Sequence, residues 1–581
     1  MDICVETLRK ENTLDNKQIT KTLKLTIQLM ELHDENPFKI RSFQSAVTTL
    51  ERESPTLLGK SPAELQEING IGKSIAEVIL EVIDSGSHKL LEQLLEKTPE
   101  GILEVLSIKG LGPKKIKTLW QELNITSTHE LMEACQSGQV AKLKGFGEKT
   151  QQSIVESLEY LDSNRGKCLF ADIEKDVEKL TQELGDLFGE GGFAVVGEYS
   201  RKLEIISLLE ILIPTKDPKG TLAKLAKLSG LEQEITLSSP YRWGGILEKH
   251  GLRCDLLLVQ PEKFMGEKLI RKAARAHLLA PVHDSQTLAV VFLSKSFDSE
   301  EEAYREAGLS FIPEELREGY FEIDLAKEGD FPRLLEYEDI KGPLHNHSTY
   351  SDGKHSLREM ATYCMSQGFD YLGMADHSQS AFYANGLNAE RVAKQQEEID
   401  QLNTEFAPFK IFKGIESDIL MDGSLDYPEE VLQSFDYVVA SVHSSLNMDQ
   451  GKATARLLKA IQNPYTTILG HPTGRLLLRR QGYPIDHKAI IDACAAHGVV
   501  IEINANPWRL DLDWRWVQYA ISQGVKLSIN PDAHETDGFE DMRYGVIVGR
   551  KGGLTKEMTL NTLGVSDLDA YFQQKRQGAS R

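Results

Sequence analysis

The residues best able to do chemistry are histidines and acids that follow apolar segments in the second half of the chain. They are His345, His347, Asp352, His377, Glu416, His443, His471, Asp532 and His534. Imidazole and carboxylate together suit zinc, manganese or iron, whereas magnesium prefers oxygen ligands alone. Nine such groups exceed the needs of one ion, and the two oxygens of Glu416 can bridge a pair. The sequence therefore predicts two or three divalent ions, with Mn2+ or Zn2+ preferred and Fe as an alternative.

Such a cluster is suited to hydrolysing phosphate esters, because bound ions lower the pKa of a water to about 7 and stabilise the leaving oxygen. Glu416 and Asp532 are therefore candidate catalytic residues, and Arg475, in a turn after His471, is placed to neutralise a bound phosphate. The alternative for Arg475 is a structural salt bridge on a loop. The alternative for the whole set, unrelated structural histidines, is disfavoured because the nine recur at successive strand ends.

A regular alternation of strands and helices from residue 344 to 581 must position these groups. Apolar strands are expected at 371–375, 409–415, 437–442, 466–469, 498–503 and 526–529, with helical patterns between them. This alternation predicts a parallel sheet, and the number of units favours a barrel. In a parallel barrel, side chains at the carboxy ends of the strands converge on one mouth.

A glycine-containing turn followed by a helical pattern recurs three times in the first 165 residues. Its candidate DNA-binding residues are Gly70, Gly72 and Lys73 in the first copy, Gly110, Gly112, Lys114 and Lys115 in the second, and Gly145, Gly147 and Lys149 in the third. Glycine permits tight turns, and the amides of the turn and of the next helix start form a nest for an anion. We expect helix-hairpin-helix binding of DNA phosphates; the alternative is an all-helical scaffold.

The intervening residues read as mixed strands and helices. Buried strands are expected at 193–197, 208–213 and 255–259. The chain is thus predicted to be a multidomain α+β and α/β protein. Its parts are a small helical DNA-binding domain at 1–85, further hairpin repeats at 86–165, a mixed α/β region at 166–330, a linker at 331–343 and the metal-binding barrel at 344–581.

Composition excludes several classes of protein. A net charge of -22 argues against coating nucleic acid by bulk attraction, although local patches can still bind it. No stretch approaches the ~20 apolar residues of a membrane span. The six scattered cysteines and the absence of a basic, apolar amino-terminal run favour a reducing cytoplasm. We therefore expect a cytoplasmic protein that does not interact with membranes.

The metal-binding motifs (H-x-H, D-H, a bridging glutamate, single histidines and a closing D-x-H) resemble those of the PHP (polymerase and histidinol phosphatase) domain. The whole chain resembles bacterial family X DNA polymerases that carry a PHP exonuclease domain, including the segments 36–41 (NPFKIR) and 312–319 (IPEELREG).

This resemblance implies a distorted seven-stranded barrel, a polymerase palm at 166–330, and metal-dependent 3′-to-5′ removal of nucleotides from DNA ends. It also implies three groups of ligands. They are His345, His347, Glu416 and Asp532; Glu416, His443 and His471; and Asp352, His377 and His534.

The palm departs from the family at its catalytic carboxylates. The first position is Leu208 and the second is Glu210, so that only Asp255 is as expected, and Glu198 brings a negative charge where a triphosphate would bind. Nucleotidyl transfer needs several carboxylates around two cations, so we predict that the palm does not synthesise DNA. The lyase nucleophile of animal relatives aligns with Val78, and no lyase activity is expected.

The leading hypothesis is a nuclease that processes single-stranded ends or gapped duplex DNA in repair. A phosphomonoesterase of small molecules would use the same metal cluster, but it would not need three DNA-type hairpins. A repair scaffold with structural metals would not need so many ligands around an open mouth. An active gap-filling polymerase with exonuclease activity is the remaining alternative.

Overall fold

The computed structural model describes residues 16–53, 57–108, 110–282, 286–329 and 331–579. The chain divides into two compact units, Met1–Arg165 and Gly166–Arg581. This division falls where the hairpin repeats were expected to end, whereas the boundaries at 85/86 and 330/331 remain predictions. None of the described helices is both long and apolar enough to cross a bilayer.

The described residues of the first unit form helices joined by turns. They are α2 (Asn16–Leu32), α3 (Pro37–Glu53), α4 (Pro62–Gln66), α5 (Lys73–Ser85), α6 (Lys89–Lys97), α7 (Glu100–Leu106), α8 (Pro113–Leu123), α9 (Thr128–Gln136), the 3-10 turn η1 (Val140–Lys142) and α10 (Glu148–Ser163). Their apolar faces share one core, which includes Ile75, Ile116 and Ile154, one from each helix that follows a repeat.

The three glycine turns have the same backbone conformation. Gly70, Gly110 and Gly145 have φ angles of 81°, 88° and 87°, in the left-handed region that favours glycine. In each turn, the amide after this glycine donates to the carbonyl two residues before it. The second glycine of each copy is the residue from which α5, α8 or α10 begins. The repetition expected from the sequence is therefore present in the backbone.

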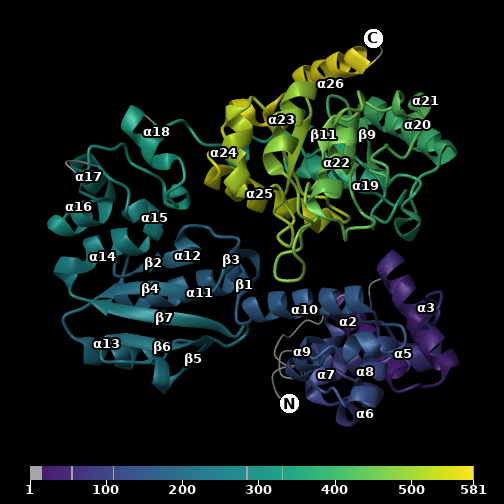
Figure 1. Ribbon diagram of the computed structural model, residues 1–581, viewed down its shortest axis with the longest axis horizontal. Helices are drawn as coiled ribbons and strands as arrows, with labels where there is room; N and C mark the ends of the chain where they lie inside the picture. The colour runs from purple at the N-terminus through teal and green to yellow at the C-terminus, as the bar shows by residue number, and fades with distance from the viewer. Residues whose placement is uncertain (1–15, 54–56, 109, 283–285, 330, 580–581) are drawn as a thin grey trace. The chain divides into compact units, whose positions relative to one another are not determined.

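The second unit begins with a five-stranded mixed sheet in the order β2-β4-β7-β6-β5 (Figure 1). This region contains β1 (Cys168–Leu169), α11 (Phe170–Phe188), β2 (Ala194–Val196), α12 (Gly197–Ser200), β3 (Ile205–Ile206), β4 (Leu209–Pro214), α13 (Pro218–Leu225), β5 (Leu231–Gln233), β6 (Arg242–Leu247) and β7 (Leu252–Val259). β4 and β7 are parallel neighbours, and their register pairs Glu210 with Asp255. The palm-like acids therefore lie side by side.

A group of short helices follows this sheet and has its own core. The helices are α14 (Phe264–Arg271), α15 (Arg275–Leu278), α16 (Leu288–Ser294), α17 (Glu300–Glu306) and α18 (Glu322–Glu328). Glu300 accepts ion pairs from Arg317 at 2.7 Å and Lys268 at 2.8 Å, and Lys272 lies 3.5 Å away. Burial works against the charge on Glu300, but these three cations outweigh it and lower its pKa to about 2.

The remaining strands form a parallel sheet in the order β13-β12-β11-β10-β9-β8. Their bounds are β8 (Tyr371–Met374), β9 (Lys410–Asp418), β10 (Tyr437–Ser441), β11 (Ile468–Leu469), β12 (Val500–Asn504) and β13 (Leu527–Asn530). The segment 343–347 joins the two edge strands, because Asn346 bridges Ala533 after β13 and accepts from Ala375 after β8. This irregular segment supplies the seventh position of the distorted barrel.

Helices surround the barrel strands (Figure 1). They are α19 (Leu357–Ser366), α20 (Ala389–Phe406), α21 (Glu429–Leu432), α22 (Gln450–Ile461), α23 (His487–His497), α24 (Trp514–Ser522), α25 (Met542–Lys551) and α26 (Val565–Ala579). Phe572 of α26 packs against Tyr437 and Phe412, which belong to a buried cluster formed by early strand residues. Apolar side chains therefore fill the amino end of the barrel and leave the carboxy end for polar groups.

The segment 331–343, expected as a linker, is packed against the barrel. The Leu335 amide donates to the Leu554 carbonyl, the Lys341 amide donates to the Asn561 carbonyl, and Leu335 and Ile340 are buried. Its charged residues gave the segment the composition of a linker, although its apolar residues hold it in place.

A buried lysine joins the barrel to the regions before it. Lys551, at the end of α25, is 1% exposed. Its ammonium donates to the Arg201 carbonyl at 2.9 Å, the Glu315 carbonyl at 3.0 Å and the Glu318 carboxylate at 2.7 Å. Each of its three N–H groups therefore has an acceptor outside the barrel.

Candidate metal centre

The structure brings all nine predicted ligands together at the carboxy end of the barrel. Their donor atoms form three overlapping groups: His347, Asp352, His377 and His534; His345, His347 and Asp532; and His377, Glu416 and His443. His471 joins them because its Nε2 lies 3.1 Å from Glu416 Oε1. The convergence expected for a parallel barrel is therefore present.

Glu416 lies at the middle of the cluster and is fully buried. Its Oε1 lies 3.3 Å from His345 Nε2 and 3.1 Å from His443 Nε2. Its Oε2 lies 2.9 Å from His377 Nδ1 and 3.7 Å from His347 Nε2. Both oxygens thus face imidazoles, which is the arrangement needed to bridge two ions.

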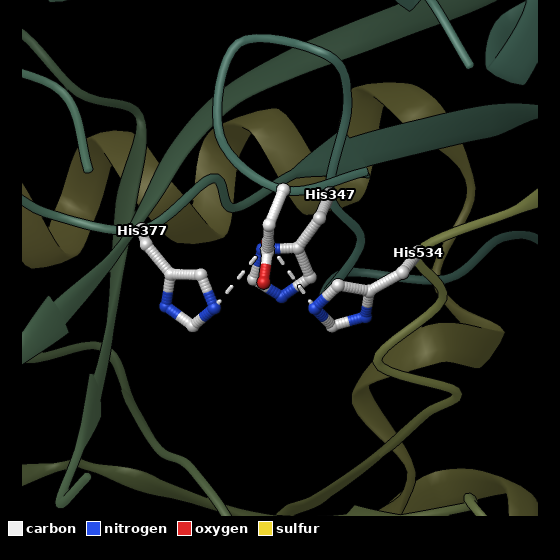
Figure 2. A group of neighbouring side chains, drawn as sticks. His347, His377 and His534 are labelled. Carbon is white, nitrogen blue, oxygen red and sulfur yellow. Dashed lines mark ion pairs between the residues drawn. The ribbon is translucent and has the colours of Figure 1, made fainter. Parts of the chain in front are cut away.

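Three imidazole rings line up beside Glu416. Figure 2 shows the ring of His347 between those of His377 and His534, and the ring centroids are 4.4 Å and 4.1 Å apart. His377 Nε2 and His534 Nε2 form ion pairs with the carboxylate of Asp352, at 3.6 Å and 3.3 Å. His347 Nε2 meets Asp532 Oδ1 at 2.9 Å.

Two buried carboxylates that sequence reasoning missed orient the histidines. Glu502 of β12 lies 2.7 Å from His345 Nδ1, and Asp418 of β9 lies 2.5 Å from His443 Nδ1. A proton held on each Nδ1 leaves each Nε2 free as a ligand. Glu502 lies between Ile501 and Ile503 on a predicted strand, and this alternation was a signal that could have revealed it, whereas Asp418 lies beyond the strand predicted at 409–415.

Asp376 directly precedes the predicted ligand His377. Its carboxylate accepts from the amides of Ser348 and Ser351, from both of their hydroxyls and from Gln395. It therefore holds the turn that leads to Asp352.

Two ligands have unusual backbone conformations for residues other than glycine. The φ angles of His471 and Asp532 are 22° and 55°. Such strain persists where surrounding contacts fix the backbone, and it is often found at functional sites. Here the His471 amide donates to Glu502, and Asn504 Nδ2 donates to Asp532.

Mutual electrostatics control the charge of the cluster. Burial raises the pKa of Glu416 and of Asp532, but the surrounding histidines outweigh it and hold both well below the ordinary range. Burial lowers the pKa of His443, but Glu416 and Asp418 overcome it and raise that pKa to about 10. For His347, burial and the neighbouring histidines lower the pKa to about 3.

The residues fit a group of divalent cations. Three buried polar atoms that face the cluster, His345 Nε2, His377 Nδ1 and Glu416 Oε2, have no hydrogen-bond partner among the residues that the structure describes. Unsatisfied buried polar atoms are unfavourable, and metal ions would satisfy such imidazole and carboxylate atoms.

Arg475 does not face this cluster. Its guanidinium pairs with Asp513 at 2.5 Å and donates to the carbonyls of Arg509 and Leu510. These contacts favour the structural alternative, because they hold the guanidinium against the 509–513 loop. The cation beside the cluster is Arg509, whose Nε lies 3.7 Å from Asp532 Oδ2. Sequence proximity to His471 had favoured Arg475, whereas no motif pointed to Arg509.

The hairpin glycines of the first unit leave an open approach to the backbone. A side chain at Gly72, Gly110, Gly112, Gly145 or Gly147 would meet nothing within 4 Å, whereas at Gly70 it would meet Ser45 and Thr49. Packing inside the protein therefore does not require most of these glycines. Lys73, Lys114 and Lys149 are exposed, and Lys115 is half-buried.

The palm acids are paired with arginines. Glu210 accepts from Arg271 at 2.9 Å, and Asp255 is 3.1 Å from Arg253 and 3.7 Å from Arg242. The half-buried Leu208 follows Ser207 in the adjoining segment.

Glu198 was expected to place its charge where a triphosphate would bind. In the structure, its carboxylate accepts from the Ser207 amide and hydroxyl and from the Leu208 amide. It therefore fastens α12 to the start of β4.

Comparison with known families agrees with this architecture. Residues 343–506 match the PHP domain, residues 14–88 match a helix-hairpin-helix domain, and residues 102–159 match a SAM-like helix-hairpin-helix tandem.

Curated relatives extend the match over the whole chain. The DNA polymerase/3′-5′ exonuclease PolX of Bacillus subtilis is 35% identical over 573 residues, which cover 97% of this chain and 100% of that protein. A probable phosphatase of Thermoanaerobacter sp. (strain X514) is 30% identical over 29% of this chain and 69% of its own length. Another, from Acetivibrio thermocellus, is 25% identical over 41% of this chain and 97% of its own length. The chain thus belongs to the PolX family, and it combines helix-hairpin-helix DNA-binding repeats with a PHP domain that acts on phosphate esters.

Proposed function

We propose that this protein is a metal-dependent 3′-to-5′ exonuclease that processes DNA ends in repair, and that its palm does not polymerise. The observation that carries the proposal is the meeting of nine imidazoles and carboxylates around Glu416, with buried donor atoms left unsatisfied. The name of the Bacillus subtilis relative includes both polymerase and 3′-5′ exonuclease. The residues present in this chain must therefore be used to decide which of the two activities it has.

The proposed ligand groups follow the three clusters. One ion would use His345, His347, Glu416 and Asp532, a second Glu416, His443 and His471, and a third Asp352, His377 and His534. Mn2+ and Zn2+ suit these donors, with Fe as the alternative. His347 also lies within the Asp352 group, and His377 within the Glu416 group, so either residue could be shared between neighbouring ions.

When bound, the ions would supply a hydroxide at neutral pH and neutralise the charge that develops on the phosphate. The protein's own contribution is orientation. Glu502 and Asp418 keep protons on His345 Nδ1 and His443 Nδ1, which aims both Nε2 atoms at Glu416. Arg509, beside Asp532, is the cation placed to pair with a nonbridging phosphate oxygen.

The palm is proposed to be inactive for two reasons. Leu208 offers no ligand atom at the first carboxylate position. Glu210 and Asp255 are occupied by Arg271, Arg253 and Arg242, and an arginine remains protonated at any physiological pH. A cation would have to displace these arginines before it could bind.

The first unit is proposed to hold the DNA. Its open glycine turns present backbone amides to phosphate. A cavity of about 700 Å³ beside the first turn is lined by Lys39, Arg41, Lys73 and Ser42, among others. Single-stranded ends and gapped duplexes are the proposed substrates.

The test is hydrolysis of a 5′-labelled strand by the full chain supplied with Mn2+. We expect progressive shortening from the 3′ end, and we expect His345→Ala or Asp532→Ala to abolish it. Full activity in both variants would remove the assignment.

A second candidate is a phosphomonoesterase of small molecules, which the probable phosphatases among the relatives favour. Turnover of a sugar phosphate should be compared with that of single-stranded DNA. Faster hydrolysis of the sugar phosphate would replace the nuclease proposal with this one.

A further inference from the structure

Two loops of the barrel, which follow β8 and β9, expose large apolar side chains. Among the described residues from 344 to 579, these side chains are Phe382 (89% exposed), Tyr383 (71%) and Met421 (69%). Phe382 and Tyr383 lie in the loop that follows the ligand His377, and Met421 lies in the loop that follows Asp418 of β9. We call these three residues the apolar rim. Large apolar side chains exposed together commonly mark a binding surface.

The rim is held by an extensive set of contacts, so its exposure is not the result of a loose loop. Ser380 donates through its hydroxyl to Asp418 and through its amide to Asp426, which ties the two loops together. Ala381 and Ala384, on either side of the exposed pair, are buried. Arg456 grips the carbonyls of Ile419 and Leu420, next to Met421. The aromatic rings are therefore presented to solvent by a fixed backbone.

The rim is continuous with the metal centre. The ring centroid of Tyr383 lies 6.3 Å from that of His377. Tyr383 is therefore placed next to one of the predicted ligands.

An aromatic ring beside a site that cleaves phosphate esters is well placed to stack on a nucleobase. A phosphate held at the ions and Arg509 would carry its base one sugar away, within reach of a neighbouring aromatic side chain. Base–aromatic stacking contributes about 1–3 kcal/mol per base and tolerates any sequence. A base inside a duplex cannot use such a surface without leaving its partner, and unpairing costs a few kcal/mol.

We propose that Phe382 and Tyr383 form a stacking platform for unpaired bases at the 3′ end, so that the barrel selects a frayed, mismatched or single-stranded terminus. This inference rests on the proposed nuclease function and names the determinant of its substrate choice. Tyr383, beside His377, receives the base nearest the cleaved bond, and Phe382 extends the surface outward.

The test is a double-mutant cycle in which the aromatic ring is removed from the protein and the terminal base is removed from the DNA, separately and together. Wild type and the variants Tyr383→Leu and Phe382→Leu are compared on a strand that ends in thymidine and on one that ends in an abasic residue. For each ring, we expect kcat/KM on the thymidine end to fall by about 5- to 150-fold, the range that corresponds to about 1–3 kcal/mol. On the abasic end we expect less than a twofold change. Equal losses on both substrates would overturn the proposal, and so would no loss on either.

Substrate choice gives a second measurement. Wild type should prefer a duplex with a mismatched 3′ terminus over a fully paired one, and both ring variants should lose most of that preference. Tyr241→Leu, which removes an exposed tyrosine of the palm, is the matched control and should keep it. An unchanged preference in the ring variants would contradict the platform and would favour a protein partner for the rim.

A binding measurement separates this proposal from the nuclease assignment. A strand with 2-aminopurine as its last base is titrated with the full-length His345→Ala protein, in which turnover is expected to stop. Stacking should quench the fluorescence, and adding Tyr383→Leu should remove most of the quenching. If the fluorescence is quenched but wild type does not hydrolyse DNA, only the nuclease assignment is wrong. If wild type hydrolyses DNA but the quenching does not depend on the Tyr383 ring, only the stacking platform is wrong.

Discussion

The barrel mouth and the palm sheet both gather carboxylates at neighbouring parallel strands, but different cations neutralise them. Around Glu416 the partners are imidazoles, which can release a proton and offer a lone pair to a metal. Around Glu210 and Asp255 they are guanidiniums, which have no lone pair to offer. Acids in similar positions therefore form a metal centre in one region and closed ion pairs in the other. The basic partner, more than the acid, decides which chemistry is available.

The most severe way to test this contrast is to remove one charge from each region. Glu416→Gln should lower DNA hydrolysis by about 10³-fold or more, because losing a bridging ligand removes several kcal/mol of stabilisation of the transition state. Glu210→Gln should change it less than twofold. The measurement is kcat/KM on a labelled single strand, together with the metal content of each protein. A comparable loss in both variants would show that the two regions act as one site.

Metal binding at the barrel mouth is expected to depend on buried acids that orient the imidazoles. Glu502→Gln should weaken metal binding by roughly 10- to 100-fold, because the neutral amide holds His345 Nδ1–H less firmly. Isothermal titration with Mn2+ or Zn2+ measures this effect. Asp339→Asn, which alters a buried carboxylate in the 331–343 segment, serves as the control. Unchanged affinity in Glu502→Gln would contradict the orienting role.

Carboxylates that are paired with lysine or arginine should also make the free energy of unfolding depend on pH in the acid range. The folded pKa of Glu300, about 2, lies below its ordinary value of 4.5. Its contribution to stability is thus complete above pH 4.5 and is lost as the pH falls towards 2. By linkage this contribution is roughly 2–3 kcal/mol. Urea unfolding from pH 6 to pH 3 should be steeper with pH in wild type than in Glu300→Gln. Parallel curves would refute the assignment.

The smallest effect is expected where one carboxylate is restored to the palm. Leu208→Asp should leave template-directed incorporation on gapped DNA at background, because Arg271, Arg253 and Arg242 still occupy the neighbouring acids. Incorporation by wild type would overturn the inactive palm. Incorporation by Leu208→Asp alone would show that the arginines leave readily.

The sequence predicted those features that depend on repetition and on strand ends. Regular alternation located the barrel strands, and placing histidines and acids after them predicted a shared mouth. The glycine turns repeated clearly enough for their common backbone to be expected. What failed depended on contacts between distant residues: Glu502 was hidden inside an apolar strand, and Arg475 turns away to Asp513. The packing of 331–343 depends on partners near residues 554 and 561.

The buried ammonium of Lys551 has a consequence for the stability of the barrel. Removing only the Glu318 carboxylate, with the surrounding chain left in place, would leave the Lys551 ammonium buried without its anion, and breaking a buried ion pair by removing one partner costs about 3–5 kcal/mol. The region before the barrel therefore contributes to the stability of the barrel itself.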